Sequence, residues 1–248
     1  MDGELLSTTD MIYEIAGLRV LLQNEYEYTT KFCREYLAAD QFSPANVTAA
    51  VTKEEFDEEK NASPQFSDGY IENICLYRSL CRQLPEFDRM LLHCSVLELD
   101  GNGYAFLGRS GTGKSTHTKL WLNAFPAARV VNGDKPILQY EKEGFIVHGT
   151  PWQGKERWGC NTSAPLRGLC FLEQAKENSI KKLSPTEVSS RLFMQILLPQ
   201  EENAVEKTLE LADKLISSTP AYLLRCNISK EAVKTSYEAL TGNPYPEN

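Results

Sequence analysis

Residues 108–115 constrain this chain more than any other stretch, because they fit the pattern G-x-x-x-x-G-K-[ST] without adjustment. In such a loop, consecutive backbone N–H groups surround a phosphate, and glycines allow a close approach at dihedral angles that side chains disfavour. Lys114 is expected to reach the β- and γ-oxygens, and the Ser115 hydroxyl to bind Mg²⁺. The pattern therefore predicts a site for ATP and Mg²⁺.

The flanking residues support this interpretation. Residues 104–108, "YAFLG", predict a strand, and helical spacing runs from Lys114 to Phe125, where Pro126 ends it. A helix N-terminus directed at the loop favours an anion. The alternative for so short a pattern is a glycine-rich turn between two elements. The expected nucleotide-binding residues are Gly108, Arg109, Ser110, Gly111, Thr112, Gly113, Lys114, Ser115 and Thr116.

Composition narrows the class of protein. The 248 residues suffice for one large domain or two small ones, and 42% hydrophobic with 24% charged residues is ordinary for a globular protein. The formal net charge of −8 and the acidic run at 53–60 argue against nucleic-acid binding. No stretch approaches the roughly eighteen apolar residues of a membrane span, and the N-terminus lacks the features of a secretory signal. We expect a cytoplasmic protein with no membrane partner.

The cysteines fit the same compartment. The chain has seven, with no C-x-x-C pair, which predicts reduced and mostly buried thiols. The three histidines lie far from any cysteine pair, so a zinc site has little support.

The first third of the chain mixes element types. We expect two short strands broken at Gly17, then a helix, a strand and a second helix, in residues 11–24, 26–37, 46–52 and 69–84. The acidic stretch 54–69 and Pro85 have linker-like composition, which places a boundary near residue 88. The predicted organisation is a small N-terminal α/β region of unknown role, residues 1–88, and a P-loop domain, residues 89–248.

The remainder contains hairpins where an ordinary P-loop NTPase alternates strands and helices in a parallel sheet. One predicted hairpin joins 93–99 to 104–108 through the turn "DGNG". Further strands are expected at 128–134, 136–150, 167–174, 179–183 and 221–227, and helices at 185–197, 201–217 and 229–240. The predicted fold class is α+β, with a mostly antiparallel or mixed sheet and the P-loop between a strand and a helix.

Asp134 is the candidate carboxylate for the chemistry. It closes an apolar strand twenty residues after Lys114, so it is expected at the phosphate end of that strand. A carboxylate there can bind Mg²⁺ together with Ser115, or accept a proton from a hydroxyl acceptor. The alternative is a turn residue in "NGDKP", which is a good turn sequence by itself.

The histidines have different expected positions. His93 precedes Gly108 by fifteen residues, so pairing through the "DGNG" turn would bring it beside the loop; the alternative is an ordinary strand histidine. His117, on the first turn of the loop helix, could face the core or the site. His148 lies on a predicted strand and is expected to be structural.

Residues 149–161, "GTPWQGKERWGCN", predict a loop that carries the cations Lys155 and Arg157 between tryptophans. Such a loop could be a lid that brings positive charge to a transferring phosphate, or a ledge for the nucleotide base. The alternative is an irregular surface loop whose tryptophans pack inward.

Four segments together resemble the catalytic domain of the HPr kinase/phosphorylase family and, more distantly, the nucleotide-binding part of phosphoenolpyruvate carboxykinases. They are "HCSVLELDGNGYAFLGRSGTGKST" from residue 93, "VVNGDKPIL" from 130, "GTP" from 149 and "RGLCFL" from 167. The resemblance covers roughly residues 90–200. It implies an antiparallel-sheet P-loop kinase in which Lys114, Asp134 and His93 are catalytic, with Asp134 as the base toward an acceptor hydroxyl and His93 supporting it.

Two departures from the family pattern affect the expected activity. The family has two adjacent aspartates at the strand end, and the first position is Gly133 here. Bifunctional members have an acidic residue two positions before the Arg-Gly pair, and that position is Pro165 here. We therefore expect no phosphorylase activity. The chain looks more like shorter kinase-like relatives with a "PW-x-G-K" segment, some of which phosphorylate serine in peptides or small molecules.

The sequence favours an ATP- and Mg²⁺-dependent phosphotransferase to a serine-type hydroxyl on a protein, peptide or small molecule, with Lys155 and Arg157 as candidate substrate or phosphate contacts. One alternative is a nucleotide-binding regulatory module without transfer activity, for which Gly133 is the best evidence. Another is a carboxykinase-like enzyme, which would need a second cationic cluster beyond Lys155 and Arg157. The sequence identifies neither the acceptor nor the oligomeric state, and it is compatible with a homo-oligomer.

Overall fold

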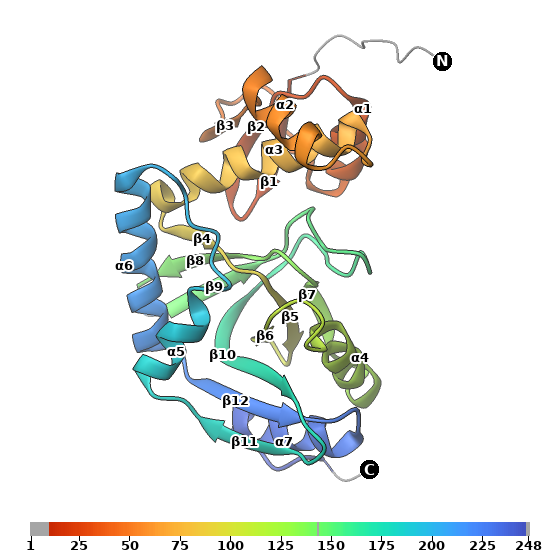
Figure 1. The fold of residues 1–248 in the computed structure, drawn as a ribbon, viewed down its shortest axis with the longest axis vertical. Coiled ribbons are helices and arrows are strands. Elements are labelled where there is room, and N and C mark those ends of the chain that lie inside the picture. The colour runs from red at the N-terminus through yellow and green to blue at the C-terminus, as the bar shows by residue number, and fades with distance from the viewer. Residues whose placement is uncertain (1–9, 143, 247–248) are drawn as a thin grey trace.

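The structure, a computed structural model, describes residues 10–142 and 144–246, and Figure 1 shows a small N-terminal part packed on a larger part built around a sheet. In the N-terminal part, strands β1 (Met11–Ile15) and β2 (Leu18–Leu22) form the predicted hairpin, and β3 (Val47–Ala49) pairs parallel to β2. The hairpin turns at Ala16 and Gly17, which both have positive φ, as tight two-residue turns between strands require.

The acidic stretch predicted as a linker is instead a helix. The N-terminal helices are α1 (Glu27–Phe32), the 3₁₀ turn η1 (Arg34–Tyr36), α2 (Lys53–Ala62), α3 (Asp68–Gln83) and the 3₁₀ turn η2 (Leu84–Phe87). The side chains of Thr52 and Glu55 each accept a hydrogen bond from the other's backbone N–H, which forms a capping box at the start of α2. Arg82 of α3 also donates to Glu55 at 2.5 Å. The linker prediction was wrong for residues 54–62, because it relied on their acidic composition and did not consider the capping residues Thr52 and Glu55.

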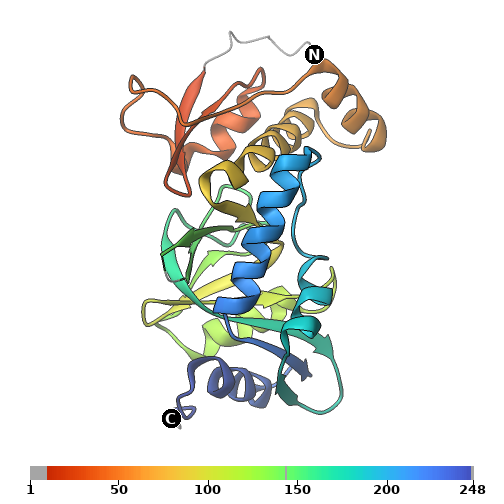
Figure 2. The same cartoon turned by 90° about the vertical axis from the view of Figure 1, so that its left-hand side faces the viewer.

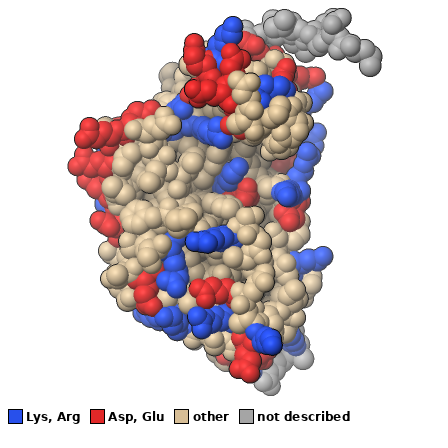
Figure 3. All heavy atoms as spheres, viewed as in Figure 1, with Lys and Arg blue, Asp and Glu red and all other residues tan. Residues whose placement is uncertain are grey.

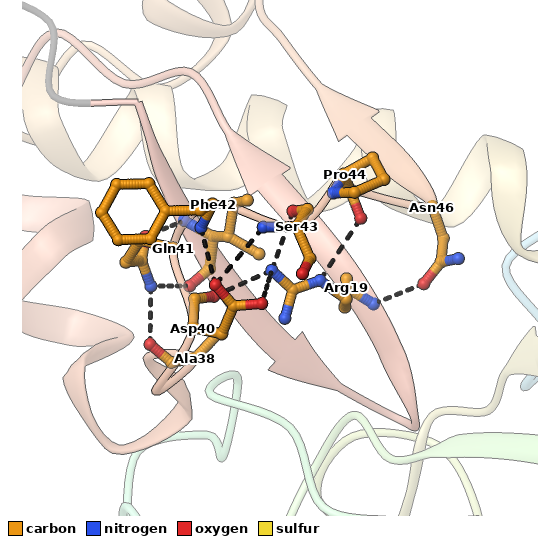
Figure 4. Close-up of polar contacts among 9 residues, drawn as sticks. Arg19, Ala38, Asp40, Gln41, Phe42, Ser43, Pro44 and Asn46 are labelled. Carbon is orange, nitrogen blue, oxygen red and sulfur yellow. Dashed lines mark hydrogen bonds and ion pairs between the residues drawn. The ribbon is translucent and has the colours of Figure 1, made fainter.

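A dense set of hydrogen bonds fixes the loop between η1 and β3 (Figure 4). The Arg19 guanidinium donates to the carbonyl oxygens of Asp40 at 2.8 Å and Ser43 at 2.9 Å. Gln41 donates to the carbonyl of Ala38 at 2.6 Å. The loop is therefore rigidly held, although Phe42 at its tip is 98% exposed.

The larger part is organised by a mixed, curled sheet whose strands follow the order β4-β8-β9-β10-β6-β5-β7, with β12 beside β10 and β11 beside β12. Strand β10 runs parallel to β6 and β12, and the other pairs are antiparallel. The sheet is therefore mixed, as the hairpins in the sequence predicted. The strands are β4 (Arg89–Leu91), β5 (Cys94–Leu99), β6 (Asn102–Leu107), β7 (Arg129–Asn132), β8 (Ile137–Glu141), β9 (Gly144–His148), β10 (Ser163–Gln174), β11 (Ser179–Lys182) and β12 (Ala221–Cys226).

Helices cover this sheet on both faces. They are α4 (Lys114–Ala124), α5 (Pro185–Leu192), α6 (Glu202–Ser218) and α7 (Lys230–Thr241). Trp121 of α4 and Tyr237 of α7 share one apolar core with the sheet, and Leu192 of α5 and Leu211 of α6 share another. Figure 2 shows α6 extending along the sheet toward the N-terminal part. The helix predicted over 185–197 ends at Leu192, and the chain beyond it forms a bridge between Ile196 and Leu92.

A third apolar core joins the two parts. It combines residues of the N-terminal sheet and of α3 with Leu91, Ile137 and Trp152 from the larger part. Lys207 of α6 pairs with Glu86 of η2 across the same junction. One apolar core thus contains residues from both sides of residue 88. The domain boundary placed there stays a prediction.

The surface charge and the state of the cysteines agree with what the composition predicts. Acidic side chains gather over α2 and over the start of α6 (Figure 3). All seven cysteines are free, and five of them are buried, as predicted. Within residues 10–142 and 144–246, no helix is both long enough and apolar enough to cross a membrane.

Candidate functional site

The glycines of the loop between β6 and α4 allow a backbone path that side chains would obstruct or strain. A Cβ atom on Gly108 would lie 2.6 Å from Oγ1 of Thr112, and Gly111 and Gly113 have φ of 84° and 104°. Gly113 is also the N-cap of α4 and supplies no side-chain acceptor to the first turn of the helix. The first N–H groups of α4 are therefore oriented for an external anion, as a phosphate site requires.

The side chain of Lys114, at the end of this loop, reaches back to the start of the loop. Its ammonium donates to the carbonyl oxygen of Gly108 at 2.8 Å. Burial lowers the pKa of Lys114, and the negative charge of Asp134 opposes that shift. Lys114 and Asp134 are therefore close enough to influence each other electrostatically.

Asp134 follows β7 in a turn that is stabilised by hydrogen bonds to the side chain of Asn132. The Asn132 side-chain oxygen accepts from the backbone N–H groups of Asp134 at 2.8 Å and Lys135 at 2.7 Å, and its amide donates to the Thr150 carbonyl at 3.1 Å. Burial alone would raise the pKa of Asp134. The hydrogen bond from His93 and the charges of Lys135, His93 and Lys114 instead hold it below its ordinary value. The carboxylate is thus ionised at neutral pH.

His93 reaches Asp134 because β5 lies between β6 and β7. The pairing of Cys94 with Leu107 brings His93 beside the loop between β6 and α4, and Nε2 of His93 lies 3.1 Å from Oδ1 of Asp134. The backbone N–H of His93 donates to the Gln195 carbonyl at 2.7 Å, which fixes the residue from its other side. The imidazole is therefore placed to orient the carboxylate.

Loop 149–161 folds back onto the end of β7. The Trp158 carbonyl accepts from the N–H of Gly133 at 2.8 Å, and the N–H of Cys160 donates to Val131 at 3.3 Å. Trp152 is buried, and its indole N–H donates to Oδ1 of Asn73 at 3.0 Å. Figure 1 shows this loop extending below the N-terminal helices. One tryptophan thus packs inward, and the loop also carries exposed cations toward the site.

A cavity of about 890 Å³ brings most of the predicted residues together. The predicted residues that line it are His93, Ser110, Gly111, Gly113, Lys114, Ser115, Thr116, Asp134, Lys155 and Arg157. Gly108, Arg109 and Thr112 belong to the loop without lining the cavity, and Arg109 is exposed. The volume is within the range of small-molecule sites.

Sequence reasoning missed the opposite side of the same cavity. Tyr28 and Phe32 of α1, and Tyr70, Ile74 and Tyr77 of α3, line it together with Lys135. The three α3 residues recur at helical spacing, which is the ordinary pattern of a core-facing stripe. The sequence did hold a signal for this side of the cavity. Ile71, Leu76 and Leu80 of the same helix are also apolar, so its apolar residues cover more than the one stripe that a single core contact needs.

The other two histidines are structural. His117 is buried and hydrogen-bonded to Ser236 of α7 at 3.0 Å, so it faces the core and not the cavity. His148 is hydrogen-bonded to Gln139 of the neighbouring strand at 2.9 Å, as expected for a structural residue.

The oxygen donors at the cavity suit a hard cation. Ser115 and Asp134 both line it, and Mg²⁺ commonly takes one or two protein ligands and completes its shell with phosphate and water oxygens. Among the described residues, no group of three or more His, Cys, Asp or Glu side chains is arranged to hold a metal ion.

Gly133 lies in close contact with the backbone of loop 149–161. A Cβ atom there would lie 3.0 Å from the Gln153 carbonyl oxygen and 3.2 Å from that of Trp158. A side chain at this position would therefore crowd two backbone carbonyl oxygens of loop 149–161, which would have to shift slightly. Asp134 itself is covered by the same loop, because a Cβ on Gly154 would lie 2.9 Å from Cβ of Asp134.

A scan of the sequence against models of protein families finds no match, and a search of curated proteins finds none either. Among solved structures, the chain is similar to the Hpr(Ser) kinase/phosphatase from Coxiella burnetii, with a TM-score of 0.33 and 10% sequence identity. The similarity covers 62% of this chain and 99% of that chain.

Proposed function

We propose that this chain is an ATP- and Mg²⁺-dependent phosphotransferase that moves the γ-phosphate to a hydroxyl acceptor of the serine type. The observation that carries the proposal is the convergence of Lys114, His93 and Asp134 at one cavity beside the N-terminus of α4. Phosphoryl transfer asks a protein mainly for a phosphate cradle, positive charge and an acid near the acceptor. These three elements meet here.

The loop residues would hold the triphosphate. The backbone N–H groups at the start of α4 and the ammonium of Lys114 would donate to the phosphate oxygens, and Ser115 and Asp134 would supply oxygens for Mg²⁺. The bound metal would neutralise charge on the β- and γ-phosphates. Lys155 and Arg157 on loop 149–161 add positive charge at the cavity rim.

Asp134 would act on the acceptor. The acceptor oxygen bonds to the γ-phosphorus as the bond to the β-bridging oxygen breaks, so ADP leaves and the hydroxyl proton passes to the Asp134 carboxylate. Its low pKa makes it a weak base, so we expect it to orient the hydroxyl first and to take the proton late. His93 holds the carboxylate in place through the 3.1 Å contact.

The substitution Asp134→Asn tests this role, because it keeps the size and turn preference of the side chain and removes its charge. Transfer of labelled γ-phosphate to serine-containing peptides, or to water if no peptide accepts it, should fall by about a hundredfold or more. Asp100→Asn, the same change in the exposed β5–β6 turn, is the matched control and should keep parental activity. Near-parental transfer by Asp134→Asn would remove Asp134 from the mechanism.

A second candidate is a nucleotide-binding regulatory module without transfer activity. Gly133 favours it, because the position carries no second carboxylate and loop 149–161 packs closely against it. Such a module would be stabilised by ATP·Mg²⁺ and yield neither ADP nor a phosphorylated product. Measuring ADP release beside thermal stabilisation of the parent protein separates the two functions.

A further inference from the structure

The side of the cavity that faces the phosphate loop is aromatic. We call it the aromatic wall; it consists of Tyr28, Phe32, Tyr70, Ile74 and Tyr77. Its rings contact one another: the centroids of Tyr28 and Phe32 are 5.7 Å apart, and those of Tyr28 and Tyr70 are 6.0 Å apart. The cavity thus has one polar and one largely apolar side.

The aromatic wall reaches the Asp134 end of the site. The ammonium of Lys135 lies 4.8 Å from the centre of the Tyr77 ring and 3.9 Å from Oδ2 of Asp134. Trp152 packs against the same ring, with centroids 5.0 Å apart. In the proposed reaction Asp134 marks the γ-phosphate end, so the aromatic wall begins where an acceptor would meet the γ-phosphate.

Hydrogen bonds hold the aromatic wall in position. The Asn73 amide donates to the Thr29 hydroxyl of α1 at 3.3 Å, and its oxygen accepts from Trp152 of loop 149–161. A Cβ on Gly69 would lie 2.6 Å from Cβ of Tyr28, so α1 and α3 are in direct contact. The aromatic side chains are therefore preorganised, which reduces the entropy lost when a ligand binds.

We propose that the aromatic wall is the acceptor subsite, and that it selects a peptide whose serine is followed by an aromatic or large aliphatic residue. The inference rests on the proposed function, which identifies the Asp134 end as the acceptor end. The serine hydroxyl is presented to Asp134 while the neighbouring apolar side chain packs on Tyr70 and Ile74. Ring-on-ring contacts of this kind favour an aromatic neighbour over a charged one.

The test uses three blocked peptides that differ only in the residue after serine, which is Phe, Gly or Asp, and the change Tyr70→Ala. The parent should phosphorylate the Phe peptide with the lowest KM. Tyr70→Ala should raise that KM about three- to tenfold, as the loss of one aromatic contact implies, and leave the KM for ATP unchanged. Phe66→Ala is the matched control. The ring centroids of Phe66 and Tyr70 are 4.6 Å apart, but Phe66 does not line the cavity.

Two results would overturn the subsite: equal KM values for the three peptides, or a Tyr70→Ala effect on the KM for ATP instead. The second would assign the aromatic wall to the adenine base. Thermal stabilisation by each peptide, measured with a non-hydrolysable ATP analogue and Mg²⁺, separates the two proposals. Preferential stabilisation by the Phe peptide without turnover contradicts the proposed phosphotransfer and supports the subsite. Equal stabilisation by all three overturns the subsite.

Discussion

The two sides of the cavity are built in different ways. The side proposed to bind phosphate, called the phosphate side below, comes from one short run of residues, 108–116, whose path depends on glycine dihedrals and which leads into the first turn of α4. The aromatic wall comes from two helices, and its residues Tyr28 and Tyr77 lie far apart in the sequence. A phosphate can be held by backbone that a short motif specifies, whereas a surface that selects an acceptor depends on which helices pack together.

The two sides also differ in how they tolerate change. The phosphate loop depends on backbone conformation, so it is sensitive at Gly108, where a side chain would collide with Thr112. The aromatic wall depends on packing, so truncation of one ring leaves the others in place. We therefore expect changes on the phosphate side to have larger effects than changes on the aromatic wall.

The largest effect is expected for Lys114→Ala, which removes the charge that holds the β- and γ-phosphates. At ATP·Mg²⁺ concentrations of about one hundred times Kd the parent should gain about 2.7 kcal/mol in unfolding free energy. A variant that binds about a hundredfold more weakly would keep less than about 0.5 kcal/mol of this gain. Lys119→Ala, on an exposed position of the same helix, is the control. Equal stabilisation of Lys114→Ala and parent in a thermal melt would contradict a nucleotide site at this loop.

A smaller effect is expected for Gly133→Asp, which tests whether the site accepts a second carboxylate. Its Cβ would press on two carbonyl oxygens of loop 149–161, so we expect a loss of about 1–3 kcal/mol in unfolding free energy. Gly144→Asp is the control, because a Cβ there meets nothing within 4 Å. Urea denaturation of both variants measures the difference. If Gly133→Asp is as stable as Gly144→Asp and transfers phosphate faster, loop 149–161 does not exclude the second acid.

The smallest effect is expected for Trp152→Phe, which breaks the hydrogen bond that joins loop 149–161 to Asn73 of α3, behind the aromatic wall. Phenylalanine fills most of the space, so the loss should be about 1 kcal/mol, mainly from the unpaired amide oxygen of Asn73. Trp158→Phe, in the same loop and only half-buried, is the control. Chemical denaturation gives the stability, and the KM for the Phe peptide should rise more than that for ATP. A KM change confined to ATP would mean that this hydrogen bond supports the phosphate side instead.

Local parts of the fold could be predicted from the sequence. The strand before the loop, the helix after it and the hairpin that carries His93 are each specified by residues close in sequence, and all are present. The position of Asp134 beside Lys114 followed from the same short connections. Helix α2 was missed although its capping residues, Thr52 and Glu55, were visible, because an acidic composition was taken as a linker.

The sequence by itself determined the glycine-rich loop between β6 and α4 and the position of the carboxylate that follows the next strand, because backbone dihedrals and short connections are local properties. Only the tertiary structure decided that β10 pairs parallel to β6, that loop 149–161 closes over Gly133, and that α1 and α3 complete the cavity. An apolar stripe on a helix specifies that it must be buried but not against what. The partner of α3 is fixed by the packing of the whole chain, through which Asn73 meets Trp152 across 79 residues of sequence.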